Sequence, residues 1–152
     1  MKKVKILRTV LIILIVLWTF LIFLFSSQDG GESSGFSRKF VEFFIKDEKL
    51  VDELEPYARK WAHFSEYGLG GVLFISLFST YEWSDKRKII TSILIGVWYA
   101  IMDEIHQLMV PGRSGALKDV YIDSLGIATG VIGMMIIIKI ISKTKKNKIA
   151  KN

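Results

Sequence analysis

The chain of 152 residues contains no cysteine, which excludes disulfide bonds and thiolate metal sites. It also lacks the polar majority of a soluble globular protein, because 51% of its residues are hydrophobic and the mean hydropathy is positive. No small-x-small cleavage site follows the first apolar run. That run is longer than the core of a signal peptide, so we expect a retained membrane anchor. The length predicts a single domain over residues 1–152.

Four apolar stretches are long enough for a helix to cross a bilayer, which takes roughly 20 residues. They cover residues 4–25, 57–81, 89–110 and 119–141. Pro56 is typical of the first turn of a helix and predicts the start of the second crossing there. The pattern predicts an all-α fold, an integral membrane four-helix bundle.

The segment 26–56 separates the first two apolar stretches. Its Gly/Ser-rich beginning, residues 26–35, predicts a loop. Further on, Phe36, Phe40, Phe43 and Phe44 recur at helical spacing and predict an external amphipathic helix. We expect its aromatic face to lie in the membrane interface, to pack on the outer end of the bundle, or to do both.

Basic residues gather before the first apolar stretch, between the second and third, and after the fourth. An excess of Lys and Arg marks the cytoplasmic side of a membrane protein. We therefore expect a multi-pass protein of the cell membrane with both termini in the cytoplasm and with segments 26–56 and 111–118 outside. The basic tail is interpreted as a topology determinant that contacts anionic lipid, and no nucleic-acid partner is expected.

Ionisable residues lie inside or at the edges of the apolar stretches, toward the predicted outer side. They are His63, Glu66, Asp103, Glu104, His106, Arg113, Asp119 and Asp123. Placing such a group in hydrocarbon costs about 2.5 to 3.5 kcal/mol on insertion scales. Glycines at 68, 70, 71, 126 and 130 would let the helices that carry these groups approach closely. Together these features predict a polar pocket that opens to the outer compartment.

The pocket residues are assigned by their chemistry. Candidate catalytic residues, able to act as a general acid or base, are His63, Glu66, Asp103 and Asp123. Candidate substrate-binding residues are Arg59, Lys60, Tyr67, Glu104, Gln107, Arg113 and Asp119. The three cations among them are suited to a phosphate or carboxylate, so the expected ligand is an anionic envelope lipid or cell-wall precursor headgroup.

Two other interpretations stay open. The pairs His63/Glu66 and Glu104/His106 could contribute ligands to a divalent metal, but the sequence has no dense metal-binding motif, so no cofactor is predicted. Alternatively, the buried charges only hold helices together as ion pairs, for example Arg113 with an aspartate of the fourth stretch. Buried pairs are costly and only conditionally stabilising, so this role explains so many charges poorly.

Three stretches of the sequence resemble the VanZ-like family of small bacterial membrane proteins. They are Ser26-Ser27-Gln28 with Glu32-Ser33-Ser34, then Lys60-Trp61-Ala62-His63-Phe64-Ser65-Glu66-Tyr67, then Asp103-Glu104-Ile105-His106-Gln107 with Pro111-Gly112-Arg113-Ser114-Gly115, Asp119 and Asp123-Ser124-Leu125-Gly126. The family is named for a protein linked to resistance to glycopeptides of the teicoplanin type. The resemblance implies a multi-pass protein of the cell envelope that affects glycopeptide susceptibility. It implies no particular reaction, so both an enzyme and a non-catalytic structural or regulatory protein remain open.

Overall fold

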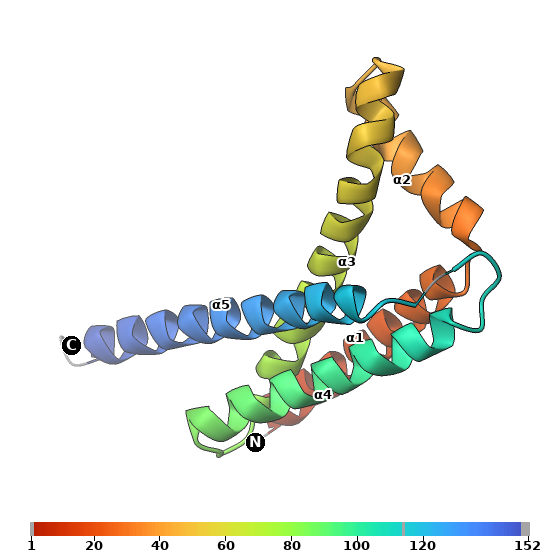
Figure 1. The fold of residues 1–152 in the computed structure, drawn as a ribbon. Helices are drawn as coiled ribbons and strands as arrows, with labels where there is room; N and C mark the ends of the chain where they lie inside the picture. The colour runs from red at the N-terminus through yellow and green to blue at the C-terminus, as the bar shows by residue number, and fades with distance from the viewer. Residues whose placement is uncertain (1, 114, 150–152) are drawn as a thin grey trace.

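The computed structural model describes residues 2–113 and 115–149 and contains helices but no strands over these residues. The helices are α1 (Lys2–Ser26), α2 (Gly30–Phe44), α3 (Glu48–Phe78), α4 (Asp85–Gln107) and α5 (Leu117–Ile149) (Figure 1). The prediction of an all-α membrane fold with an additional helix after the first apolar stretch is confirmed.

Three helices, α1, α4 and α5, are long and apolar enough to cross a membrane. Each of them exposes large apolar side chains, among them Val16, Leu94 and Ile140. A contiguous apolar surface of this kind is stable only against lipid or a partner. α3 does not reach the same hydropathy because its middle carries His63, Glu66 and several glycines. The crossing expected over residues 57–81 therefore stays a prediction.

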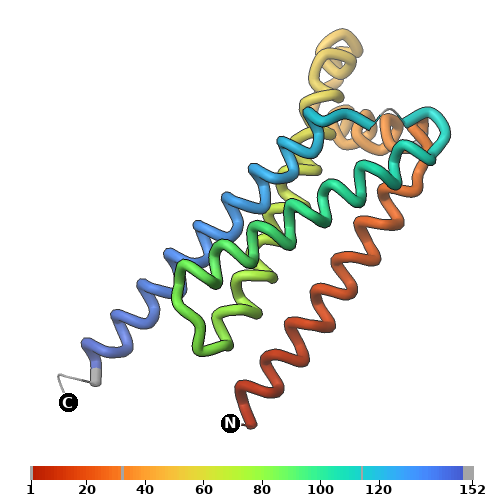
Figure 2. The backbone as a smooth tube through the Cα atoms, turned by 60° about the horizontal axis from the view of Figure 1, so that its bottom comes forward, coloured from red at the N-terminus to blue at the C-terminus, as the bar shows by residue number. Residues whose placement is uncertain are grey.

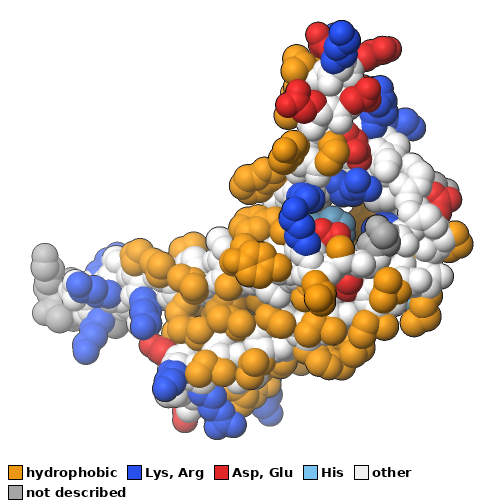
Figure 3. Space-filling view, viewed as in Figure 1, with side chains coloured by type: hydrophobic (Ala, Val, Ile, Leu, Met, Phe, Trp, Pro, Cys, Tyr) orange, Lys and Arg blue, Asp and Glu red, His pale blue; other side chains and the backbone are white. Residues whose placement is uncertain are grey.

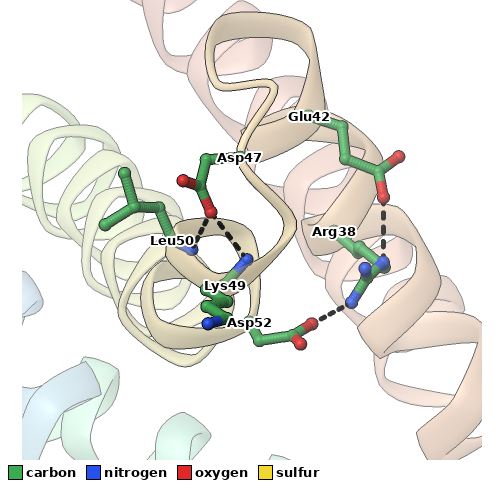
Figure 4. Close-up of polar contacts among 6 residues, drawn as sticks. All are labelled: Arg38, Glu42, Asp47, Lys49, Leu50 and Asp52. Atoms are coloured by element: carbon green, nitrogen blue, oxygen red, sulfur yellow. Dashed lines mark hydrogen bonds and ion pairs between the residues drawn. The ribbon is translucent and has the colours of Figure 1, made fainter.

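α3 begins eight residues before Pro56, so the predicted start of this helix is wrong. Asp47 caps the helix: its side chain accepts hydrogen bonds from the backbone N–H groups of Lys49 at 2.9 Å and Leu50 at 3.3 Å (Figure 4). Such a cap satisfies N–H groups that would otherwise lack partners in the first turn. Pro56 removes only one backbone N–H from the helix interior, and the cap with the contacts of α2 outweighs that loss.

The loop predicted over residues 26–35 is only partly correct, because α2 already starts at Gly30. The backbone N–H of Gly30 donates to the carbonyl of Pro111 at 3.3 Å. A side chain at position 30 would collide with the carbonyl of Gly112, so a glycine is required at this contact. Packing against the distant segment 108–116 thus fixes a helix start that local composition does not favour.

α2 folds back on α3 through a turn that ion pairs stabilise. Arg38 bonds Glu42 at 2.8 Å and also pairs with Asp52 across the turn (Figure 4). The four phenylalanines at 36, 40, 43 and 44 are 60–77% exposed, so most of the aromatic face lies free of the bundle. Its placement in the membrane interface stays a prediction.

α3 and α5 cross at a steep angle, and α3 continues with α2 as an arm beyond the crossing (Figures 1 and 2). At the crossing a Cβ on Gly126 would meet the Phe64 carbonyl, and one on Gly130 would meet the Gly68 carbonyl. The predicted role of these glycines in close helix contact is confirmed. The core beside the crossing is a cluster that includes Trp18, Ile22, Tyr67, Phe74, Ile75, Ala100, Ile127 and Val131.

Candidate functional site

Two neighbouring cavities lie where the arm of α2 and α3 meets α1, α4 and the segment 108–116. The first has a volume of about 280 Å³ and the second about 230 Å³. Arg59, His63 and Arg113 line both of them. We call the two cavities together the chamber. Figure 3 shows basic, acidic and histidine side chains gathered at this place, above a largely apolar body.

The chamber brings together most of the residues predicted from the sequence. Glu66, Tyr67 and Asp103 line the first cavity. Lys60, Gln107, Asp119 and Asp123 line the second. Three separate elements, α3, α4 and the start of α5, therefore point polar groups to one region, as the helical periodicity of the sequence predicts.

His63 and Asp123 face each other across the gap between α3 and α5. Their closest atoms, Nδ1 and Oδ1, are 3.7 Å apart, and the Asp123 side chain is 1% exposed. Neither oxygen of Asp123, nor Nδ1 of His63, nor the Tyr67 hydroxyl has a hydrogen-bond partner within residues 2–113 and 115–149. A buried polar group without a partner costs about 1–3 kcal/mol, so this cluster destabilises the fold, and a functional role would explain why it is present.

The close glycine contact explains why these two residues meet. Gly126 lies three residues after Asp123, and its backbone approaches the carbonyl of Phe64, the residue after His63. A larger residue at position 126 would push α5 away from α3. The spacing of the polar pair therefore depends directly on the glycine packing below it.

Arg113 connects the end of α1 with α4. It donates from Nε to the Gln28 carbonyl at 3.1 Å, from one terminal nitrogen to the Phe25 carbonyl at 2.9 Å, and from the other to Gln107 at 2.9 Å. The amide of Gln107 in turn donates to Asp103 at 2.9 Å. Carbonyl groups at the end of a helix have no partner within the helix, so Arg113 caps α1.

The Arg113 guanidinium keeps capacity for a ligand as well. A guanidinium has five N–H groups, and three of them are used in these contacts. Burial lowers the pKa of Arg113 from its ordinary value, whereas Asp103 raises it, and the side chain remains a cation at neutral pH. Its positive charge therefore faces both cavities.

Arg59 and Lys60 are held more loosely. Arg59 lies 3.8 Å from Glu55 and donates to the Ser34 hydroxyl at a long 3.4 Å. Lys60 makes no hydrogen bond or ion pair to the part of the chain that the structure describes. Both cations can therefore reorient toward an anion in the second cavity without breaking a strong contact.

Two ionisable residues near the chamber have structural contacts instead. Glu104 accepts a hydrogen bond from the backbone N–H of Ala116 at 2.5 Å and lines neither cavity. His106 stacks on Phe23 with ring centroids 4.7 Å apart, and its Nε2 lies 3.1 Å from the Ser27 hydroxyl. These contacts fix the segment 108–116 and the end of α1 in place.

The sequence reasoning assigned no site role to the wall that α2 and the end of α1 supply. Gln28, Ser33 and Phe36 line the first cavity, and Ser34 lines the second. The signal for these positions was present in the Ser26-Ser27-Gln28 and Glu32-Ser33-Ser34 stretches. It carried no geometric information, because the fold of α2 onto α3 is a tertiary contact.

A metal centre finds no support in the donor geometry. Among residues 2–113 and 115–149, no three histidine, aspartate or glutamate side chains lie close enough together to hold a metal ion. The chamber instead combines three cations with carboxylates and one histidine. This composition is suited to an anionic ligand.

The fold and the chamber define a helical membrane protein with a polar site set into an apolar body. The VanZ/LLP1 family matches residues 11–139, and the chain belongs to this family. The match runs from α1 to α5 and includes every chamber residue. No curated protein and no solved structure matches the chain.

Proposed function

We propose that the chamber binds the anionic headgroup of an envelope lipid or a lipid-linked cell-wall precursor at the outer face of the membrane. The observation that carries this proposal is the placement of Arg59, Lys60 and Arg113 around one cavity. Phosphate and carboxylate groups are the ligands that such a set of cations favours, and Arg binds them through two parallel hydrogen bonds. Asp119 and Asp123 in the same wall repel an anion, so we expect the headgroup to sit on the Arg59 and Lys60 side.

The His63–Asp123 pair supports processing of the headgroup in addition to binding. The Nδ1 of His63 lies 3.7 Å from Asp123, beyond hydrogen-bond distance. A catalytic contact of this kind tightens when the ligand binds, so that the carboxylate then orients the imidazole as a general base. We therefore assign His63 as the group that takes up a proton and Asp123 as the residue that orients it. The variant His63→Asn should then still bind the headgroup but no longer convert the bound lipid to product. Glu66 and Asp103 are further acids within the chamber.

The cellular role follows from the family and the location of the site. We infer a multi-pass protein of the cell membrane with cytoplasmic termini, because the basic residues gather at the end of the bundle opposite the chamber. We propose that binding or modification of envelope lipids on the outer side affects susceptibility to glycopeptides of the teicoplanin type, as the family membership suggests. The alternative, in which the charges only hold helices together, is supported by the contacts of Arg113 and Glu104. Within residues 2–113 and 115–149 it does not account for Lys60, which makes no hydrogen bond or ion pair, or for Asp123, whose buried oxygens accept no hydrogen bond.

Binding of phosphatidic acid to the purified protein in lipid nanodiscs tests the proposal. The double variant Arg59→Gln, Lys60→Gln should bind phosphatidic acid about tenfold more weakly, because tenfold corresponds to about 1.4 kcal/mol, the size of one charge-assisted contact. The matched control is Lys46→Gln, Lys49→Gln, which removes the same charge from the α2–α3 turn outside the chamber and should leave binding unchanged. Equal loss in both double variants, or equal binding of phosphatidic acid and phosphatidylcholine to the wild type, would contradict a headgroup site in the chamber.

A further inference from the structure

An apolar groove, separate from the two cavities of the chamber, lies on the surface between α3 and α5. It has a volume of about 190 Å³, and we call it the lateral groove. Its lining residues are Tyr57, Lys60, Trp61, Phe64, Ile122 and Leu125. Apart from the ammonium group of Lys60, the hydroxyl of Tyr57 and the indole N–H of Trp61, these side chains are apolar, so the groove offers mainly hydrocarbon contact.

The glycine crossing closes one end of the groove. Phe64 and Leu125 lie beside the close contact that the two helices make at Gly126. From there α3 and α5 diverge toward their outer parts (Figures 1 and 2). The groove is therefore the wedge that opens between two crossing helices, and its position follows from the same glycines that bring His63 to Asp123.

The lateral groove and the chamber adjoin each other. Lys60 and Ile122 line both the groove and the second cavity. A lysine in this position lays its aliphatic stem on apolar surface and keeps its ammonium group at the polar side. Trp61 and Tyr57 are residue types that favour the depth where lipid headgroups meet chains. Polar and apolar surfaces thus meet at Lys60 in the order in which they meet in a lipid.

We propose that the lateral groove binds the beginning of a hydrocarbon chain whose anionic headgroup occupies the chamber. The inference rests on the proposed function and specifies its ligand as a membrane lipid that enters sideways between α3 and α5. From Tyr57 to Phe64 the groove extends about 10 Å along α3. A lipid chain covers one leaflet, about half of a bilayer core that is about 30 Å thick, so the groove holds roughly two thirds of the chain and the rest stays in the membrane.

A variant that fills the groove separates chain binding from headgroup binding. Leu125→Trp places a large ring in the groove, whereas Ile132→Trp makes a similar change on an exposed apolar position of the same helix outside it. We expect Leu125→Trp to weaken binding of dioleoyl phosphatidic acid at least tenfold and to leave binding of glycerol phosphate, which has no chain, within twofold of the wild type. Ile132→Trp should change neither ligand.

A second measurement uses the wild-type protein, so it does not depend on how a variant folds. Phosphatidic acid with a photoreactive diazirine in its chain is cross-linked in nanodiscs, and the labelled peptides are mapped. We expect labels on residues 57–64 of α3 and 122–125 of α5 that excess unlabelled phosphatidic acid removes. Labels confined to α1 or α4, or equal effects of the two tryptophan variants, would overturn the groove while headgroup binding stands. Glycerol phosphate binding as tight as phosphatidic acid would identify a soluble anion as the ligand and overturn it too. If neither ligand binds, the proposed function fails as well.

Discussion

Arg113→Ala should lower the free energy of unfolding by about 3 kcal/mol, the largest effect that we expect from a single substitution. The guanidinium donates three hydrogen bonds, to the Phe25 carbonyl in the last turn of α1, to the Gln28 carbonyl just after that helix and to Gln107 of α4. A hydrogen bond to a charged group contributes about 1.5–3 kcal/mol, and part of that is recovered when the carbonyls at the helix end find water. The loss is measured by denaturant titration of the purified protein in detergent.

Arg113→Lys distinguishes the guanidinium geometry from its charge. A lysine ammonium cannot reach three acceptors from two helices in one plane, so this variant should keep less than half of the lost stability. The control is Arg87→Ala, which removes a guanidinium that stacks on the Trp83 ring at the opposite end of the molecule. It should cost less than about 1 kcal/mol. Full stability in Arg113→Ala would show that the segment 108–116 does not hold α1 as described.

Gly130→Ala should destabilise the protein by about 1–3 kcal/mol, whereas Gly133→Ala should be neutral or stabilising. A Cβ at position 130 would collide with the Gly68 carbonyl, which is backbone and cannot rotate away. A Cβ at position 133 meets nothing within 4 Å, and alanine favours a helix over glycine by up to about 1 kcal/mol. Each variant adds one methyl group to the same helix, at positions three residues apart, so the two are a matched pair.

The position of the collision also predicts an effect on the chamber. If Gly130→Ala separates α3 from α5, the distance between His63 and Asp123 grows, and binding of phosphatidic acid should weaken in the fraction that still folds. Thermal midpoints in detergent and binding in nanodiscs measure the two consequences. Equal midpoints for Gly130→Ala and Gly133→Ala would contradict the crossing of α3 and α5.

The helical spacing of polar and charged residues predicted much of this architecture, because such spacing can be read within a single helix. The polar faces of α3, α4 and α5 are visible as residues three and four positions apart, and the structure gathers His63, Asp103 and Asp123 around the chamber. The glycines of the α3–α5 crossing are visible in the same way. These predictions hold in the structure because residues three and four positions apart always lie on the same face of a helix.

The parts that the sequence did not predict depend on contacts between distant segments. The start of α2 at Gly30 requires the backbone of Gly112, and the cap by Asp47 makes Pro56 an interior residue of α3. The sequence predicted Arg113 only as an anion-binding residue, whereas in the structure it also donates hydrogen bonds to carbonyls at and just after the end of α1. Neither spacing nor composition contains this information, because each contact joins residues that are separated along the chain.

The central claim is that the chamber opens to the outside of the cell and receives an anionic headgroup. The natural chain has no cysteine, so a single cysteine can report on one place. Ser34 lines the second cavity, and the exposed Lys86 lies at the opposite, basic end of the molecule, before the apolar stretch 89–110. Ser34→Cys in intact cells should react with a membrane-impermeant maleimide, and Lys86→Cys should react only after the membrane is opened.

In nanodiscs, phosphatidic acid should slow the reaction of Ser34→Cys at least threefold, and phosphatidylcholine should not. This one labelling series reports both on the side of the membrane and on the occupant of the chamber. Reaction of Lys86→Cys but not Ser34→Cys in intact cells, or equal rates with the two lipids, would contradict the account.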